Sequence, residues 1–90
     1  MAEIKVEKPS EKKLVDLGVK NWSPWECEPS EFDWEYASNE TAYLYEGKVI
    51  IKTSGGEKVE INAGDLVFFP KGLKCSWHVL QRVRKVYKFS

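Results

Sequence analysis

Hydrophobic and polar positions alternate along much of this chain, and the clearest example lies before its middle. Phe32, Trp34 and Tyr36 are separated by two acidic residues, Asp33 and Glu35. Because successive side chains of a β-strand point to opposite faces, this spacing places the rings together on one face. We therefore expect the rings to point inward and the carboxylates to face water.

Similar short segments, divided by glycine turns, predict about eight strands in all. Their ranges are 4–6, 32–36, 41–46, 49–53, 58–61, 66–69, 73–80 and 83–89. The segment 21–29 holds two prolines and is expected to be extended rather than helical. Many short strands at regular spacing are typical of an antiparallel sandwich or barrel, so the fold class is all-β.

One short helix is predicted near the N-terminus. Ser10 is a favoured N-cap residue, Glu11 suits the first helical turn, and Gly18 ends the helix. The predicted organisation is one domain over residues 1–90, with an N-terminal strand and helix in 1–20 and a barrel in 21–90.

Ninety residues make a small domain, and four Trp, four Tyr and four Phe supply much of its core. No apolar run approaches the roughly 20 residues of a membrane span, and the first residues form no hydrophobic leader. We expect a soluble, intracellular chain, in the cytoplasm unless an organelle leader has been removed. Cys27 and Cys75 lie far apart and are expected to be free thiols.

Charge is balanced overall but unevenly distributed. Residues 21–47 hold seven acidic and no basic side chains, whereas residues 48–90 hold nine basic and three acidic ones. The basic stretch from Arg82 to Lys88 could contact nucleic acid, but no recognition motif accompanies it. We therefore predict that this last strand forms ion pairs with the acidic strands and that the chain binds no nucleic acid.

Two spaced sets of residues resemble the signatures of the cupins, a family of small jelly-roll β-barrels. Gly64, Pro70 and Gly72 match the second signature, with Cys75 at the position of its histidine. Glu40 and Gly47 match the end of the first signature, and counting back from Glu40 puts Trp34 and Tyr36 at its two histidine positions.

Within the cupins, the chain is most similar to the small cupin domains of ureidoglycine aminohydrolase and the ethanolamine-utilisation protein EutQ. The resemblance implies a single-domain, jelly-roll antiparallel β-barrel, association through an edge strand into a homodimer, and, in catalytic members, a divalent metal inside the barrel. The four positions implied as metal ligands are Trp34, Tyr36, Glu40 and Cys75.

These four residues make a poor metal site. An indole N–H only donates, so Trp34 cannot be a ligand, and the phenol of Tyr36 is a weak one. Glu40 and Cys75 are too few for a closed site. We predict no metal and no cofactor, with a divalent metal as the less favoured alternative.

A shift of one residue would turn Asp33 and Glu35 inward beside Glu40, and three carboxylates could hold a hard cation. That register would expose a stripe of three aromatic rings to water, at a large cost in buried apolar area. The alternation therefore argues against it.

The inward residues instead predict an aromatic pocket for a small, partly apolar ligand. Its expected lining is Trp34, Tyr36, Glu40, Tyr43, Cys75 and Trp77. Glu40 is the candidate hydrogen-bond acceptor or general acid or base, and Tyr36 and Cys75 are further catalytic candidates. His78 lies an odd number of residues from Cys75 and should face the other side of the strand, so a Cys–His pair is not expected.

Two functions follow. The favoured one is a metal-free cupin domain that binds a small molecule, or whose rings only fill the barrel as a structural module. The alternative, which the resemblance implies, is a hydrolase acting on a C–N bond of a ureido compound, possibly with a metal. The expected partner is a small-molecule ligand, with no nucleic acid and no membrane, and the sequence does not decide between a monomer and a homodimer.

Overall fold

The computed structural model describes residues 4–89. The parts of the predicted domain 1–90 that fall on residues 1–3 and 90 lie outside the described residues. Residues 4–89 form seven antiparallel strands, one α-helix and one 3₁₀ turn. The elements in chain order are β1 (Lys5–Glu7), α1 (Glu11–Leu17), η1 (Val19–Asn21), β2 (Ser23–Cys27), β3 (Ser30–Glu35), β4 (Glu40–Thr53), β5 (Lys58–Asn62), β6 (Leu66–Phe69) and β7 (Lys74–Phe89). The predicted all-β antiparallel fold with one short helix is confirmed.

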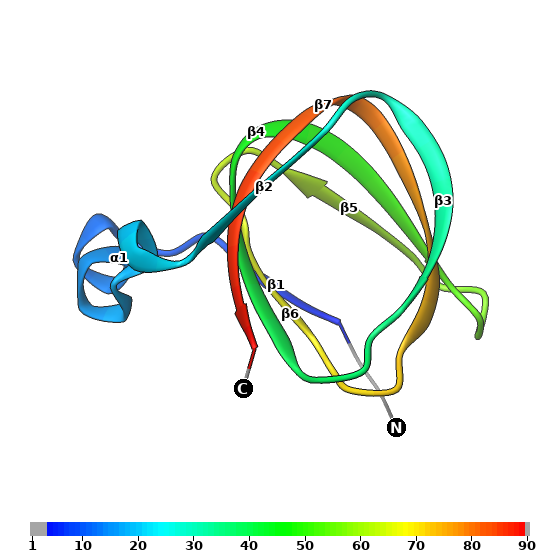
Figure 1. Ribbon diagram of the computed structural model, residues 1–90, viewed down its shortest axis with the longest axis horizontal. Coiled ribbons are helices and arrows are strands. Elements are labelled where there is room, and N and C mark those ends of the chain that lie inside the picture. The colour runs from blue at the N-terminus through cyan, green and yellow to red at the C-terminus, as the bar shows by residue number, and fades with distance from the viewer. Residues whose placement is uncertain (1–3, 90) are drawn as a thin grey trace.

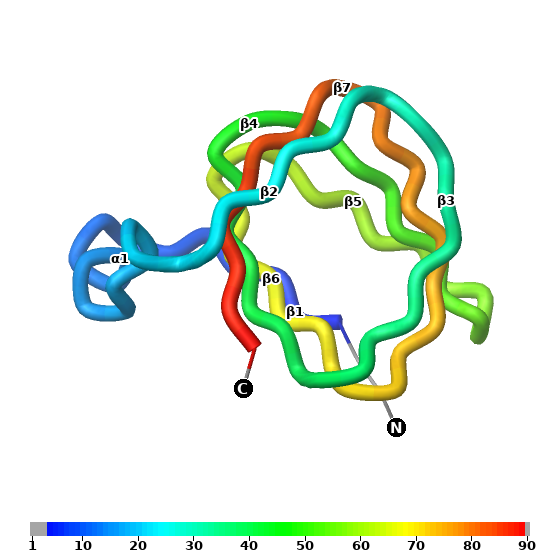
Figure 2. Tube along the Cα trace, in the orientation of Figure 1, coloured from blue at the N-terminus to red at the C-terminus, as the bar shows by residue number. Residues whose placement is uncertain are grey.

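Two long strands, β4 and β7, hold the fold together. They pair with each other along most of their length. In the half formed by the start of β4 and the end of β7, β6 pairs with β4, β1 pairs with β6, and β2 pairs with β7. In the other half, β5 pairs with β4 and β3 pairs with β7. Because both strands bend at their middle, the two halves face each other around a common interior (Figures 1 and 2).

The bend lies at Gly47, where the register of β4 against β7 shifts three times between Leu44 and Val49. Gly47 has a φ of 112°, and a Cβ built on it would lie 2.6 Å from the backbone oxygen of Arg82. Only glycine allows the two backbones to approach this closely. The eight predicted strands are therefore wrong in number: 41–46 and 49–53 are one bulged strand, as are 73–80 and 83–89.

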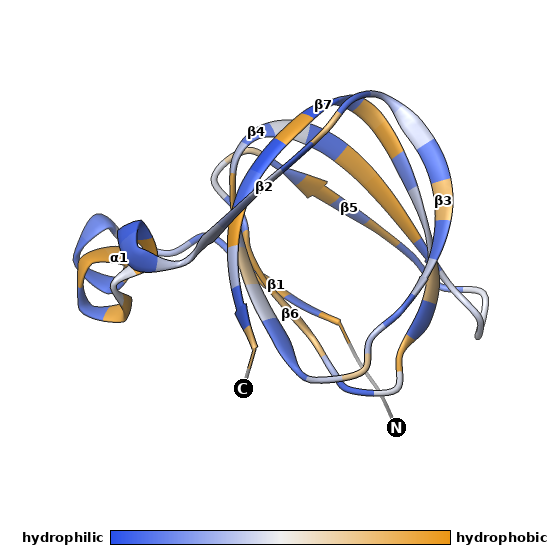
Figure 3. Ribbon diagram, in the orientation of Figure 1, coloured by the Kyte–Doolittle hydropathy of each residue, from blue (hydrophilic) through white to orange (hydrophobic). Residues whose placement is uncertain are grey.

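The bulge also changes which residues of β4 face inward. Ala42 and Leu44 are fully buried before it, whereas Val49 and Ile51 are fully buried after it. An extra residue in one strand shifts the alternation by one position. The main core therefore collects even-numbered residues from the first half of β4 and odd-numbered ones from the second, and the colours alternate along the strands in Figure 3.

The predicted orientation ahead of the turn at residue 38 is confirmed for Phe32 and Tyr36, whereas Trp34 is 50% exposed. Tyr36 is 3% exposed and Phe32 packs against the main core, whereas Asp33 and Glu35 are exposed. The Asp33 carboxylate accepts a hydrogen bond from the Ser76 hydroxyl at 2.7 Å on the outside of the sheet. The alternative register with inward carboxylates is therefore excluded for this strand.

The helix begins and ends as predicted. The Ser10 hydroxyl accepts a hydrogen bond from the Lys13 backbone N–H, and Gly18 closes the helix with a φ of 71°. The helix lies outside the ring of strands (Figure 1). Here a second cluster of buried side chains covers the outer face of the sheet: Val19, Trp22, Leu66 and Val86, with Leu14 and Tyr43 packed against it.

The uneven charge is explained by strand pairing, as predicted. Arg82 of β7 contacts the carboxylates of Glu26 and Glu28 at 3.1 and 3.0 Å, and Arg84 lies 3.7 Å from Glu46. The basic strand therefore neutralises the acidic strands beside it. Across residues 4–89, none of the helices has the length and hydrophobicity needed to cross a membrane.

Candidate functional site

A cavity of about 210 Å³ opens among aromatic side chains from β2, β3, the residue that follows β3, and β7, and β4 contributes Glu40 to its wall. The alternation of these strands turns one side chain in two toward it. Its lining residues are Trp25, Phe32, Trp34, Tyr36, Glu40, Trp77, Lys85, Tyr87 and Phe89. Seven of the nine are aromatic, and the two others are a carboxylate and an ammonium.

These two charges form a buried ion pair. The Lys85 Nζ donates a hydrogen bond to the Glu40 Oε2 at 2.9 Å, and each side chain is only 6% exposed. Glu40 begins β4 and Lys85 lies near the end of β7, so the long pairing between the two strands brings them together. Taking two charges out of water is expensive, and close pairing is what makes it tolerable.

Aromatic rings complete the surroundings of the ammonium. The Lys85 nitrogen lies 4.7 Å from the ring centre of Trp77, 4.9 Å from that of Trp25, 5.6 Å from that of Tyr87 and 6.0 Å from that of Phe69. Each ring face attracts a cation at this range. The positive charge is thus held by one carboxylate and a partial cage of rings.

Burial shifts the proton equilibria of this interior. It lowers the pKa of the Lys85 ammonium, and the negative charge of Glu40 offsets only part of that effect. Burial, reinforced by the Glu40 charge, raises the pKa of the Tyr36 hydroxyl far above its ordinary value. Burial also raises the pKa of the Cys75 thiol to about 11. Tyr36 and Cys75 are therefore both protonated at neutral pH.

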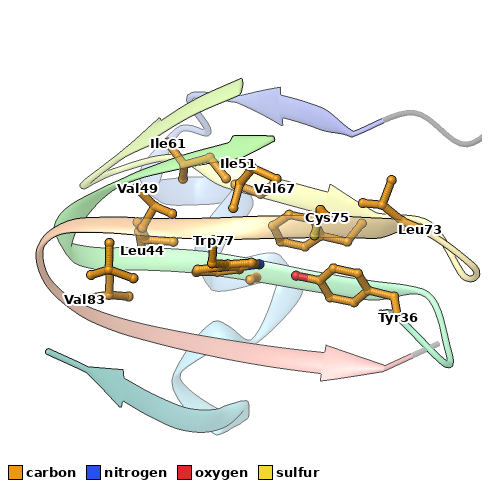
Figure 4. Close-up of a cluster of buried hydrophobic side chains, with 13 residues drawn as sticks. Tyr36, Leu44, Val49, Ile51, Ile61, Val67, Leu73, Cys75, Trp77 and Val83 are labelled. Atoms are coloured by element: carbon orange, nitrogen blue, oxygen red, sulfur yellow. The ribbon is translucent and has the colours of Figure 1, made fainter. Parts of the chain in front are cut away.

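One polar atom beside the cavity is poorly satisfied. The indole N–H of Trp77 is fully buried and forms no hydrogen bond of good geometry within residues 4–89, although it lies close enough to the Tyr36 hydroxyl and the Cys75 thiol to favour their charged forms. In Figure 4 the indole nitrogen of Trp77 and the hydroxyl of Tyr36 point toward one another. Buried N–H groups are nearly always satisfied, and the Tyr36 hydroxyl and the Cys75 sulfur are the acceptors beside this one.

Four of the six predicted lining residues take their expected places. Tyr36, Glu40 and Trp77 are buried at the cavity, and Trp34 lies at its edge, where it is 50% exposed. Cys75 is buried in the core but is not part of the cavity lining.

The prediction that Tyr43 lines the pocket was wrong. Tyr43 packs on the outer face with the helix, because it lies an odd number of residues from the inward-facing Glu40 on the same strand. His78 also points away from Cys75, as predicted, and its Nδ1 lies 3.4 Å from a Glu31 carboxylate oxygen.

Sequence reasoning missed five of the nine lining residues: Trp25, Phe32, Lys85, Tyr87 and Phe89. The signal was present, since counting by twos along β7 from the inward-facing Trp77 reaches Lys85 and Tyr87. The basic residues around Lys85 made the whole segment resemble a solvated face. Trp25 lies in a proline-containing segment with no clear alternation, so the pattern did not predict that its side chain faces inward.

The donor set does not fit the divalent metal implied by the resemblance. Within residues 4–89, no three His, Cys, Asp or Glu side chains are placed to hold one ion. Glu40, the best ligand among the implied positions, already accepts a hydrogen bond from Lys85. That leaves the Cys75 sulfur as the one ready donor among the four implied positions, which is too few to hold an ion.

Comparison with known proteins gives the family. A family model described as the EutQ-like cupin domain matches residues 14–87. "Acetate kinase EutQ" of Clostridioides difficile (strain 630) is 34% identical over 62 residues, which cover 69% of this chain and 39% of that protein. The chain thus spans about two fifths of the length of this curated relative.

Two solved structures agree with this assignment. A DUF861 family protein from Thermotoga maritima is 55% identical, with a TM-score of 0.97 over 98% of this chain and 100% of the other. The EutQ protein of Clostridium difficile is 33% identical, with a TM-score of 0.65 over 71% of this chain and 50% of the other. The chain belongs to the EutQ-like cupin domain family.

Proposed function

We propose that this chain binds a small, neutral, planar molecule with an oxygen acceptor, and that it does so without a metal. The observation that carries the proposal is the combination of an aromatic cavity and a buried Glu40–Lys85 ion pair at its wall. Cavities of this composition, apolar with a few convergent polar groups, are typical of ligand sites.

The ion pair is hard to explain by packing alone. Buried ion pairs can often be replaced by apolar side chains of similar size with no loss of stability, or with a gain of about 1–4 kcal/mol. A barrel that only needed filling would be served as well by leucine and methionine. The cost of keeping two desolvated charges therefore supports a role in recognition.

The charges also restrict the ligand. Because the carboxylate of Glu40 cancels the ammonium of Lys85, a charged ligand would leave an uncompensated charge in the interior. A neutral molecule avoids that cost, and its carbonyl or amide oxygen can accept a hydrogen bond from a Lys85 N–H that Glu40 does not take. At about 210 Å³ the cavity is smaller than the roughly 300–1,000 Å³ typical of drug-sized ligands, so the ligand is a small one.

Benzamide is a suitable probe, since it is flat, neutral and carries an amide oxygen. We expect its titration to move the indole N–H signal of Trp77 in a ¹H–¹⁵N NMR spectrum, with saturation. Trp22 is the internal control, because it packs on the outer face of the sheet. Benzoate, the charged analogue, should bind at least tenfold more weakly. A Trp77 signal that stays fixed at millimolar benzamide would refute the proposal.

Two other activities have less support. The ureido C–N hydrolase implied by the resemblance needs metal ligands for which this site offers no fitting donor set, and no observation favours it. Acetate kinase activity is named for the relative from Clostridioides difficile, of which this chain covers only 39%. Neither is proposed here.

A further inference from the structure

We propose that the Lys85 amine forms a reversible covalent imine with a small aldehyde bound in the cavity. The inference rests on the proposed binding function and names the ligand class: a flat, apolar aldehyde. It follows from the placement of a primary amine, rather than a guanidinium, at the wall of an aromatic cavity beside a carboxylate.

The geometry supplies the groups that imine formation requires. The amine nitrogen lines the cavity, so a carbonyl carbon held among the rings can reach it. The Glu40 carboxylate lies 2.9 Å away and can take and return a proton.

The amine must lose its proton before it can attack. An exposed lysine has an ordinary pKa near 10.4, so only about one in a few thousand is unprotonated at pH 7. Burial lowers the pKa of Lys85, which raises that fraction. A desolvated lysine in an apolar pocket is a recognised way of activating an amine toward carbonyl compounds. Among residues 4–89, Lys85 is the one buried lysine.

The steps balance without any further reactant. Glu40 takes a proton from the Lys85 ammonium, and the free amine attacks the aldehyde carbon while the carbonyl electron pair moves to oxygen. A proton passes from nitrogen to that oxygen, which gives a neutral carbinolamine. Glu40 then returns its proton to the hydroxyl group, which leaves as water. The product is a protonated imine beside a carboxylate, so the charge of the site is unchanged.

Reductive trapping with benzaldehyde tests the inference. The full chain is incubated with benzaldehyde and sodium cyanoborohydride at neutral pH and analysed by peptide mass mapping. We expect one benzyl group at Lys85, formed at least tenfold faster than at any exposed lysine. The Lys88→Met variant is the matched control, because Lys88 lies on the same strand, near Trp22 on the outside, and its loss should leave the label at Lys85.

Two outcomes separate this inference from the binding function. If benzamide moves the Trp77 signal but benzaldehyde labels Lys85 no faster than the exposed lysines, the imine is refuted and the binding site stands. If neither ligand affects the cavity, both proposals are refuted. The Lys85→Met/Glu40→Leu double variant, which should fold, is expected to lose the fast label altogether.

Discussion

Removing one charge of the Glu40–Lys85 pair is expected to destabilise the barrel, whereas removing both is not. The pair is 2.9 Å apart and each side chain is 6% exposed, so either partner left alone is a desolvated charge. Breaking such a pair costs about 3–5 kcal/mol. Replacing both partners, as in Glu40→Leu/Lys85→Met, should leave stability within about 1 kcal/mol of the wild type or raise it by up to about 4 kcal/mol.

The surroundings also predict which single variant suffers more. In Glu40→Leu, the ammonium of Lys85 keeps four ring faces at 4.7–6.0 Å, and burial favours loss of its proton. In Lys85→Met, the carboxylate keeps no cation, and the rings present their negative faces to it. We therefore expect Lys85→Met to lose more stability, at the upper end of the range of about 3–5 kcal/mol.

Urea denaturation followed by tryptophan fluorescence measures these differences directly. A domain of this size has a total stability of about 5–15 kcal/mol, so the single variants should show large shifts in midpoint. Lys88→Met serves as the control and should stay within about 0.5 kcal/mol, because Lys88 is exposed on the same strand. A double variant as unstable as Lys85→Met would refute the reasoning, since it would show that packing rather than charge sets the cost.

Three further results are expected. Gly47→Ala should lower the free energy of unfolding by at least about 2 kcal/mol, because the new Cβ would lie 2.6 Å from the Arg82 backbone oxygen. Gly56→Ala, which has open space around it, should lower it by about 1 kcal/mol. Equal losses in urea denaturation would contradict the bulge argument. Because the pKa of Cys75 rises from 9.0 to about 11 on folding, its contribution to stability should be complete below pH 9 and lost as the pH rises through 11. The fall in the denaturation midpoint over this range should therefore be smaller in Cys75→Ala, where Tyr36 still contributes to it. Chelation with EDTA should leave benzamide binding unchanged; a loss restored by a divalent ion would overturn the metal-independent account.

Much of the fold follows from local chemistry. The alternation through Phe32, Trp34 and Tyr36 set the inward face of β3, and Ser10 and Gly18 set the ends of the helix. These signals act over a few residues and need no tertiary information, which is why they could be read directly from the chain.

The bulge could not be predicted in the same way. Gly47 was expected to make a tight connection between two strands, but it lies within one strand where two backbones meet. A glycine with positive φ suits both cases, and only the partner strand distinguishes them. The residues of β4 that face inward change from even-numbered to odd-numbered at the bulge, so the sequence pattern of this one strand resembled that of two separate strands.

The candidate site was predicted only in part, because its two charged residues lie far apart in the sequence. Glu40 was found by its spacing, but its partner lies 45 residues away in a run of basic side chains. Lysine is almost never fully buried unless paired, so its residue type argued against the inward position that the alternation along β7 gives Lys85. Its partner Glu40 comes within reach only when β4 and β7 are placed side by side.

The central claim is that the buried charges serve ligand binding rather than packing. Its most direct test is a benzamide titration of the wild type and of Glu40→Leu/Lys85→Met, followed at the Trp77 indole N–H. The account predicts a saturable shift in the wild type and, in a double variant that is equally well folded, a shift that is absent or needs at least tenfold more benzamide. Equal binding by both proteins, or by neither, would contradict it.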